Sequence, residues 1–259
     1  MVSSIYQHFR PEEKEFIDQV LQWRREAAEM YVPKLTDFLD PREQEIVQSV
    51  VGTHNDAVVF FFGGTDPSER KRAYICPDYF APKEKDFDIV LYELNYPDKF
   101  VTITHPQVLG SLMGLGLRRG KFGDILTDGQ VIQFIAAKEV SSYIELNFHH
   151  VGKAAVTLRQ IGYDQAIRQE EEWKEVSVTV SSLRLDAIIT AFTKQSRQKA
   201  QAAIKGGLVK VNWKQQENPA LECTEGDVLS IRGAGRVKIS TIDGKTKKEK
   251  WRIILGVIK

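Results

Sequence analysis

The sequence predicts an α+β protein built from three small parts, and three observations lead to this prediction. Helical and strand-like apolar patterns alternate along the 259 residues. A hydrophobic content of 42% is enough for real cores and argues against global disorder. Residues 183–259 carry 16 Lys and Arg against 7 Asp and Glu, whereas the rest of the chain carries 20 against 28. We therefore expect domains at residues 1–80, 81–165 and 176–259, the last of them basic.

The first part has the pattern of a small α/β unit. A helix is predicted over residues 11–30, because proline stands in its first turn and glutamates follow near the positive end of the helix dipole. A second helix is expected over residues 41–52. The apolar run 57–62 predicts a buried strand, and residues 74–76 are expected to be its antiparallel partner after a charged turn at 69–72.

The central part alternates strands and helices in a diagnostic order. Residues 89–92 and 100–104 are both strand-like, and a helix is expected to start at His105 and to end near Gly120. The remaining predicted elements are strands at 123–126 and 130–135 joined by a hairpin turn, a helix at 138–148 and a strand at 156–161. This order of strand, helix, two strands, helix and strand is typical of ferredoxin-like domains, including RNA-recognition motifs.

A polar linker at 164–174 is expected to lead into the basic part. Two short helices are predicted there, one opening at 183–186 and one starting near Ser196. A Gly206–Gly207 stop and an alternating strand at 208–212 follow. The chain is expected to end in a β-hairpin that turns at Asp243–Gly244 and has a lysine-rich tip.

This helix pair gathers cations beside a glycine turn that lets another backbone approach closely. Ser196 is expected to cap the second helix, where free amides favour a phosphate. The strand that follows adds Lys210 and Asn212 to the candidate binding residues. Clustered cations of this kind are the electrostatic footprint of nucleic-acid binding. The cations expected to bind phosphates are Arg184, Arg197, Lys199 and Lys205.

A second candidate contact site lies in the central part. Arg118, Arg119 and Lys121 stand next to Gly120 and Gly123 and can bind a phosphate. The alternative is a solvated helix end whose cations complement the dipole. The predicted central strands offer few aromatic residues, so we do not expect this sheet to stack bases as RNA-recognition motifs do.

The basic part resembles the S4 domain, a small RNA-binding module. The resemblance rests on about 55 residues, with elements in the expected order. They are Leu183–Arg184–Leu185–Asp186, then Ser196–Arg197, then Ile204 through Asn212, and finally Glu225 through Ile231. The resemblance implies that Asp186 caps or salt-bridges the first helix.

The whole chain resembles the YlmH family of bacterial RNA-binding proteins. The residues that carry this resemblance outside the basic part are His105–Pro106, Leu109–Gly110, Leu115–Gly116, Arg118 and Gly123–Asp124–Ile125. The resemblance implies a non-enzymatic RNA binder. It also implies association with the large ribosomal subunit, through ribosomal RNA and tRNA, during rescue of stalled nascent chains.

Other function classes find little support in the sequence. Cys76 and Cys223 are far apart, so neither a zinc site nor a disulfide framework is expected. We expect no metal, no cofactor and no small-molecule substrate. No apolar run is as long as a membrane span, and residues 1–16 lack the apolar core of a signal peptide. A cytoplasmic protein is therefore predicted.

Two alternatives remain open. Pseudouridine synthases place a catalytic aspartate in a tripeptide similar to Arg184–Leu185–Asp186, so an RNA-modifying enzyme that uses the S4 domain for substrate delivery is one. A protein-interaction adaptor that uses the acidic N-terminal part is the other.

Overall fold

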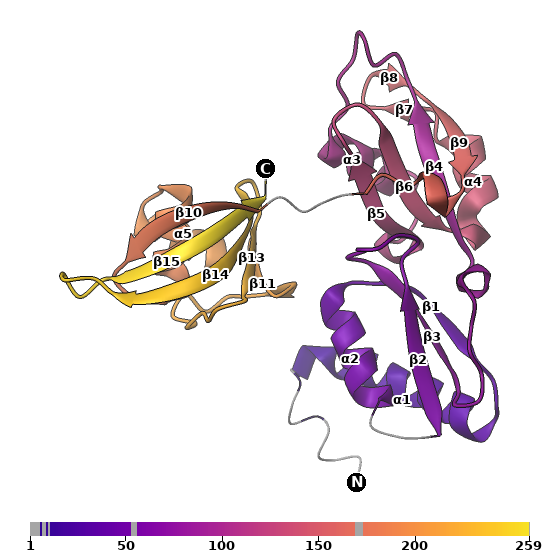
Figure 1. The fold of residues 1–259 in the computed structure, drawn as a ribbon, viewed down its shortest axis with the longest axis horizontal. Coiled ribbons are helices and arrows are strands. Elements are labelled where there is room, and N and C mark those ends of the chain that lie inside the picture. The colour runs from indigo at the N-terminus through magenta and orange to yellow at the C-terminus, as the bar shows by residue number, and fades with distance from the viewer. Residues whose placement is uncertain (1–5, 7–8, 10, 53–55, 169–172, 259) are drawn as a thin grey trace. The chain divides into compact units, whose positions relative to one another are not determined.

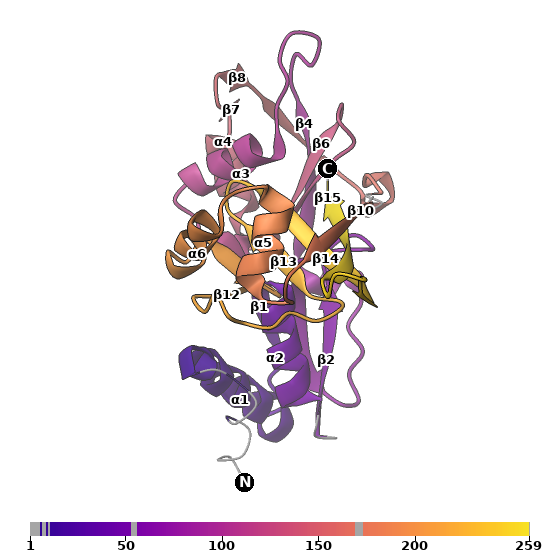
Figure 2. The same cartoon turned by 90° about the vertical axis from the view of Figure 1, so that its left-hand side faces the viewer.

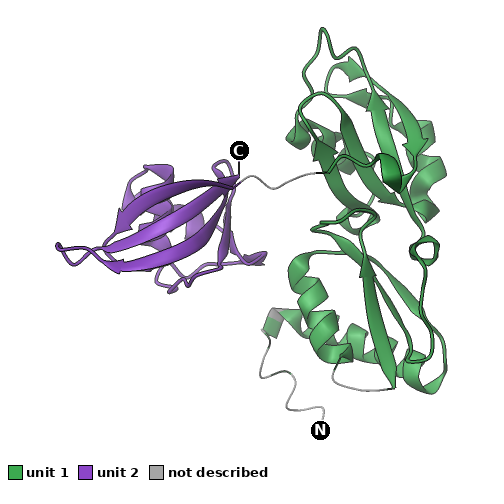
Figure 3. Cartoon of the chain, viewed as in Figure 1, with its two compact units in different colours: residues 1–169 green, residues 170–259 purple. Residues whose placement is uncertain are grey.

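The computed structural model describes residues 6, 9, 11–52, 56–168 and 173–258. It divides into two compact units, Met1–Gln169 and Glu170–Lys259 (Figure 3). Both units combine helices with antiparallel sheets, which confirms the predicted α+β class.

The N-terminal part of the first unit is an antiparallel sheet in the order β1-β3-β2, with α1 and α2 packed on it (Figure 1). Asp40 starts α2, because its carboxylate accepts a hydrogen bond from the Glu43 amide at 2.9 Å and the Glu43 carboxylate accepts one from the Asp40 amide at 2.7 Å. The elements are η2 (Pro11–Glu13), α1 (Lys14–Glu29), β1 (Lys34–Leu39), α2 (Pro41–Val51), β2 (Ala57–Phe62) and β3 (Lys71–Pro77).

The sequence did not predict β1. Its register against β3 shifts between Leu35 and Phe38, so its apolar residues do not alternate with the regular period of two. The predicted turn at 69–72 is shorter than expected, since β3 already begins at Lys71.

The central part has a four-stranded antiparallel sheet in the order β5-β6-β4-β9, with α3 and α4 on one face. Numbered within the domain, this order is 2-3-1-4, the ferredoxin-like arrangement that the sequence predicted. The larger elements are β4 (Ile89–Asn95), α3 (His105–Gly114), β5 (Phe122–Thr127), β6 (Ile132–Ala137), α4 (Ser141–Asn147) and β9 (Thr157–Ile161). Shorter ones are η3 (Glu84–Phe87), η4 (Arg119–Lys121), η5 (Lys138–Val140), β7 (His150–Val151), β8 (Ala154–Ala155) and η6 (Tyr163–Gln165).

Two predictions for this part were wrong. Residues 100–104 form no strand, and α3 ends at Gly114 instead of near Gly120. Both edges of β4 are occupied, by β6 and by β9, so residues 100–104 cannot pair with the strand that precedes them in the sequence. Val101 and Ile103 instead pack against the core from a loop, which accounts for their strand-like apolar pattern.

The N-terminal part packs on the other face of the central sheet. Leu91 and Ile135, from the two middle strands, share a buried cluster with Phe38 of β1. A Cβ atom at Gly123 would lie 2.9 Å from the Phe38 ring, so only glycine permits this close approach. The two parts of the first unit therefore share one continuous interface.

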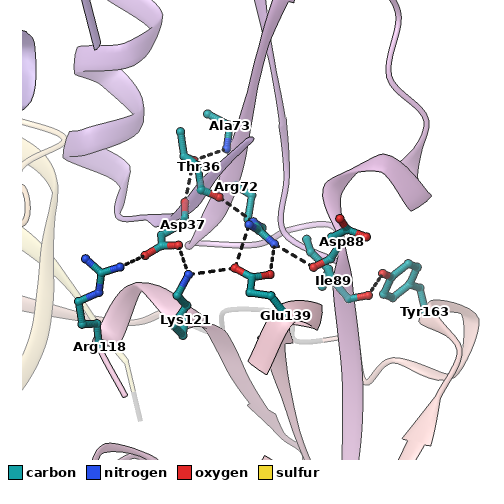
Figure 4. Close-up of polar contacts among 10 residues, drawn as sticks. All are labelled: Thr36, Asp37, Arg72, Ala73, Asp88, Ile89, Arg118, Lys121, Glu139 and Tyr163. Carbon is teal, nitrogen blue, oxygen red and sulfur yellow. Dashed lines mark hydrogen bonds and ion pairs between the residues drawn. The ribbon is translucent and has the colours of Figure 1, made fainter. Parts of the chain in front are cut away.

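A buried arginine reinforces that interface (Figure 4). Arg72 of β3 is 4% exposed. It donates hydrogen bonds to the carbonyl oxygens of Thr36 at 2.7 Å and Asp88 at 2.9 Å. Its guanidinium also pairs with the Glu139 carboxylate of the central part at 3.1 Å. Arg72 thus links β1, the residue that precedes β4, and η5.

The C-terminal unit is one six-stranded sheet in the order β10-β15-β14-β13-β11-β12, with α5 and α6 packed on one face (Figure 2). The predicted helix pair and terminal hairpin are both present. The hairpin turns between Lys245 and Trp251 and not at Asp243–Gly244, because register shifts keep those two residues within the strand β14 (Gly235–Lys245).

The elements of this unit are β10 (Trp173–Val180), α5 (Leu185–Thr193), α6 (Arg197–Lys205), β11 (Val209–Val211), β12 (Lys214–Gln215), β13 (Val228–Ile231), β14 (Gly235–Lys245) and β15 (Trp251–Ile258). Of the predicted linker, residues 169–172 lie outside the described residues.

Both cysteine thiols are expected to be unreactive in the folded protein. Burial raises the pKa of Cys76 to about 11, and burial together with the nearby Asp227 raises that of Cys223 to about 12. Because the thiolate is the reactive form, a thiol reagent at pH 8 should label the native chain at least tenfold more slowly than the chain in guanidinium chloride. Equal labelling rates would contradict the burial of these residues.

Candidate nucleic-acid interface

Helices α5 and α6 begin at defined residues. The Ser196 hydroxyl oxygen accepts a hydrogen bond from the Lys199 amide at 3.4 Å and caps α6. Ile188 of α5 and Ile204 of α6 are fully buried in the core of the unit. The cap therefore sets Arg197 as the first residue of α6, and the buried isoleucines hold both helices on the sheet.

One buried carboxylate joins the two helices. Asp186, in the first turn of α5, has no exposed surface. Arg184 donates hydrogen bonds to it at 3.2 and 3.1 Å, and Arg197 does so at 3.1 and 3.2 Å. Gln201 adds a further bond at 2.7 Å. Two guanidinium groups from different segments are thus held side by side, with 37% and 51% of their side chains exposed.

These hydrogen bonds keep the Asp186 carboxylate ionised and Arg184 protonated. Burial alone would raise the pKa of the Asp186 carboxyl, but the hydrogen bonds from Arg184, Arg197 and Gln201 outweigh burial and hold that pKa well below its usual range. The hydrogen bond to Asp186 in turn raises the pKa of Arg184. Each guanidinium has five N–H donors, of which Asp186 engages two, so donors remain for phosphate oxygens.

The predicted cations of α6 do not share one face. Arg197, Gln201 and Lys205 follow one another at four-residue spacing and lie along one side of the helix. Lys199 lies about 200° around the helix axis from Arg197, given about 100° per residue. The structure thus places Arg184, Arg197 and Lys205 on one surface, which we name the α5–α6 surface, whereas exposed Lys199 lies on another side of α6.

The two strand residues predicted for the same surface lie elsewhere. Lys210 is exposed between two buried valines of β11, so its side chain points to the sheet face opposite the helices. The Asn212 amide donates a hydrogen bond to the Asp227 carboxylate at 2.8 Å and accepts one from the Val228 amide at 2.8 Å. Asn212 also has a left-handed φ of 50°. Its contacts serve the turn after β11.

The cations predicted in the central part have different surroundings (Figure 4). Lys121 lies 2.6 Å from Asp37 of β1 and 3.0 Å from Glu139. Burial alone would lower the pKa of Lys121, but hydrogen bonds to these two carboxylates raise it. Arg118 lies 3.5 Å from Asp37 and remains 82% exposed. Lys121 therefore holds the two parts of the first unit together, whereas Arg118 is accessible to a ligand.

Arg119 is a structural residue. Its guanidinium donates hydrogen bonds to the carbonyl oxygens of Phe122 at 2.6 Å and Gly123 at 3.2 Å. Burial, together with repulsion from Arg70, lowers the pKa of Arg119 to about 10. We therefore do not include Arg119 or Lys121 in the proposed interface.

The central sheet has no open face comparable to that of an RNA-recognition motif. Those domains stack bases on aromatic residues of the two middle strands. Here the corresponding face of β4 and β6 is covered by the N-terminal part and by residues 163–167. Phe134, the aromatic residue of β6, is fully buried and belongs to the core on the helix side. Base stacking on this part of the sheet is excluded in this conformation.

Comparisons with known proteins agree with this architecture. One family model, described as "Putative RNA-binding domain in YlmH", matches residues 82–165, and a second, "YlmH, N-terminal", matches residues 12–80. The S4 domain model matches residues 183–229. A Bacillus subtilis (strain 168) protein named "Ribosome-associated protein quality control protein P2" is 48% identical over 252 residues, which cover 97% of this chain and 98% of the relative. The chain belongs to the YlmH family.

A solved YlmH structure is similar in fold. The "Cell division protein ylmH from Streptococcus pneumoniae" is 30% identical, with a TM-score of 0.54, and the match covers 63% of this chain and 99% of that chain. None of the helices described in this YlmH-family chain is long and apolar enough to cross a membrane. Its described residues include no cluster of three or more side chains suited to holding a metal ion.

Sequence reasoning missed two groups of polar residues in this YlmH-family protein. The hydrogen bond from Gln201 to Asp186 was not predicted, although the four-residue spacing of Gln201 from Arg197 indicates that both lie on one side of the helix. Asp37 and Glu139 lie far from Lys121 in sequence, and no local pattern connects them. Their role became visible only in the folded unit.

Proposed function

We propose that this protein is a non-enzymatic RNA-binding protein that acts on the ribosome. The α5–α6 surface binds phosphate groups of structured ribosomal RNA. The observation that carries this proposal is the pair of guanidinium groups, Arg184 and Arg197, held side by side by the buried Asp186. Donors held in place before binding lose little conformational entropy when a phosphate binds.

Family membership supports a more specific setting. The RNA is ribosomal RNA of the large subunit, bound together with tRNA, and the process is rescue of stalled nascent chains in the cytoplasm. The name of the B. subtilis relative supports a role in ribosome-associated quality control. The S4 match over residues 183–229 supports the C-terminal unit as the part that contacts RNA.

The buried position of Asp186 argues against the competing enzyme. An aspartate that attacks or protonates a nucleotide must be exposed to it. The Asp186 carboxylate is fully buried and accepts hydrogen bonds from Arg184, Arg197 and Gln201. These contacts support a role in orienting those side chains.

Reversing two lysine charges on α6 is expected to weaken RNA binding. The variant Lys199→Glu/Lys205→Glu leaves the Asp186 hydrogen bonds intact, because neither lysine side chain contacts that cluster. Affinity for 50S subunits and for ribosomal RNA fragments should fall about 10- to 100-fold at 0.15 M salt. The slope of log K against log salt should become shallower by about 1–2. Co-sedimentation and filter binding over a salt series measure both effects.

Lys85→Glu/Lys153→Glu is the matched control. Both lysines are exposed in the first unit, and the change in net charge is the same. Equal losses in both double variants would mean that only total charge matters. Unchanged binding by the α6 variant would remove the α5–α6 surface from the proposal.

A further inference from the structure

The outer face of the C-terminal sheet, opposite α5 and α6, is polar and basic. Side chains alternate along β11, β13, β14 and β15, and the buried members of each strand belong to the core beneath the helices. The intervening residues must point the other way. Four cations occupy such outward positions and define what we name the outer face: Lys210, Arg236, Lys238 and Arg252.

Strand register brings these cations together. Lys210 of β11 pairs with Ser230 of β13, and Ser230 pairs with Arg236 of β14, so the three side chains form one row. Lys238 lies two residues further along β14, about 7 Å from Arg236. Adjacent strands are about 4.8 Å apart, which sets Lys210 and Arg236 about 10 Å apart at the backbone.

Two tryptophans lie on the same face. The Arg236 guanidinium carbon is 6.0 Å from the centre of the Trp213 ring, which places that ring beside the cation row. Gly256 pairs with Lys238 and so faces outward, and a Cβ atom there would lie 3.2 Å from Trp173. Aromatic rings among cations form the surface on which unpaired bases stack while the backbone is neutralised.

Three of the four cations that define this face are not paired with acidic side chains of the described residues. Within the described part of the chain, Lys210, Lys238 and Arg252 form no ion pair. Glu175 of β10, which pairs with Gly256, is an acidic residue on this face. On the α5–α6 surface, by contrast, Asp186 offsets part of the positive charge of Arg184 and Arg197. The outer face is therefore complementary to a polyanion in its own right.

We propose that the outer face is a second RNA-binding surface, which binds an RNA segment with unpaired bases. Lys210, Arg236 and Lys238 contact its phosphates, and Trp213 stacks on a base. The C-terminal unit then binds RNA on both sides of one sheet and can hold two RNA segments at once. This inference adds a site to the proposed function, which needs only the α5–α6 surface.

The test separates the two surfaces by their preferred RNA. The probes are a fluorescein-labelled 12-nucleotide uridine oligomer and a labelled RNA duplex, titrated with the full-length protein. We expect Lys210→Glu/Lys238→Glu to weaken oligomer binding at least tenfold while duplex binding changes less than threefold. Lys199→Glu/Lys205→Glu should show the reverse pattern. Trp213→Leu should weaken oligomer binding about 5- to 100-fold, as loss of one stacked base does.

A second measurement tests whether one protein molecule holds both RNA probes at once. Energy transfer between a donor-labelled duplex and an acceptor-labelled oligomer should rise with wild-type protein and vanish with either double variant. Lys85→Glu/Lys153→Glu controls for net charge, and Lys210→Gln/Lys238→Gln controls for the effect of introduced acids on the strands.

The outcomes distinguish this inference from the proposed function. If only the α6 variant weakens binding of both probes, the second surface is refuted and the proposed function stands. If neither variant changes binding of either probe, both proposals fail. If the outer-face variant keeps oligomer binding but loses an acidic protein partner in pull-downs, the face binds protein and the RNA assignment is overturned.

Discussion

Replacing Arg72 by methionine is expected to lower the free energy of unfolding of the first unit by about 3–5 kcal/mol. Methionine fills a similar volume but donates no hydrogen bonds. The carbonyl oxygens of Thr36 and Asp88 would lose their guanidinium donor, and Glu139 would lose its partner. Because Arg72 is 4% exposed, water cannot easily replace these bonds.

Arg118→Met is the matched control for this prediction. It removes an arginine from the same polar cluster, but the Arg118 side chain is 82% exposed and its pair with Asp37 is 3.5 Å long. Stability should change by no more than about 0.5 kcal/mol. Hydrogen exchange of peptides from β1 and β4 in increasing urea reports on the first unit alone. Comparable destabilisation by both variants would refute the special role of Arg72.

Replacing Asp186 by asparagine is expected to lower the stability of the C-terminal unit by about 2–4 kcal/mol and to weaken RNA binding. Asparagine keeps the shape but leaves Arg184 and Arg197 without the carboxylate that holds them together. The partly exposed guanidinium groups would be solvated, which limits the loss of stability. They would also become mobile, and a phosphate would then have to order them.

The stability that Asp186 contributes to the folded chain is expected to fall as the pH is lowered. The pKa of Asp186 is depressed in the folded chain, so its stabilisation is fully present above the pKa of about 3.9 expected in the unfolded chain. That stabilisation is lost as the pH falls below about 5 toward the folded value. Urea titrations of the wild type and Asp186→Asn should therefore converge as the pH is lowered. Asp243→Asn, at an exposed hairpin residue, is the control. A constant difference between wild type and Asp186→Asn from pH 7 to pH 3 would contradict the depressed pKa.

The parts of the fold predicted correctly are those with strong local signals. The cap at Ser196 and the glycine turn after Lys205 defined the ends of α6. Short apolar runs also revealed β2 and β6, and turn residues between two strand-like segments revealed the terminal hairpin. Where the local signal was irregular, prediction failed, as in β1 with its shifted register.

The strand-like pattern at 100–104 failed for a different reason. Val101 and Ile103 are as apolar as strand residues and do pack on the core. A strand also needs a free edge beside it, and that depends on residues far along the chain. In the folded domain β6 and β9 occupy both edges of β4.

By itself the sequence determined the class of the fold, the family and the location of a cation-rich helix pair, because caps, periodicity and composition are local properties of the chain. Only the tertiary structure decided which cations are available to a ligand. Lys121 meets Asp37 across 84 residues and Arg72 meets Glu139 across 67, so these pairs have no sequence signature. Lys210 and Arg197 are close in sequence, yet they face opposite sides of one sheet. The physical reason is that ion pairing and exposure depend on distance through space, which exists only once the chain has folded.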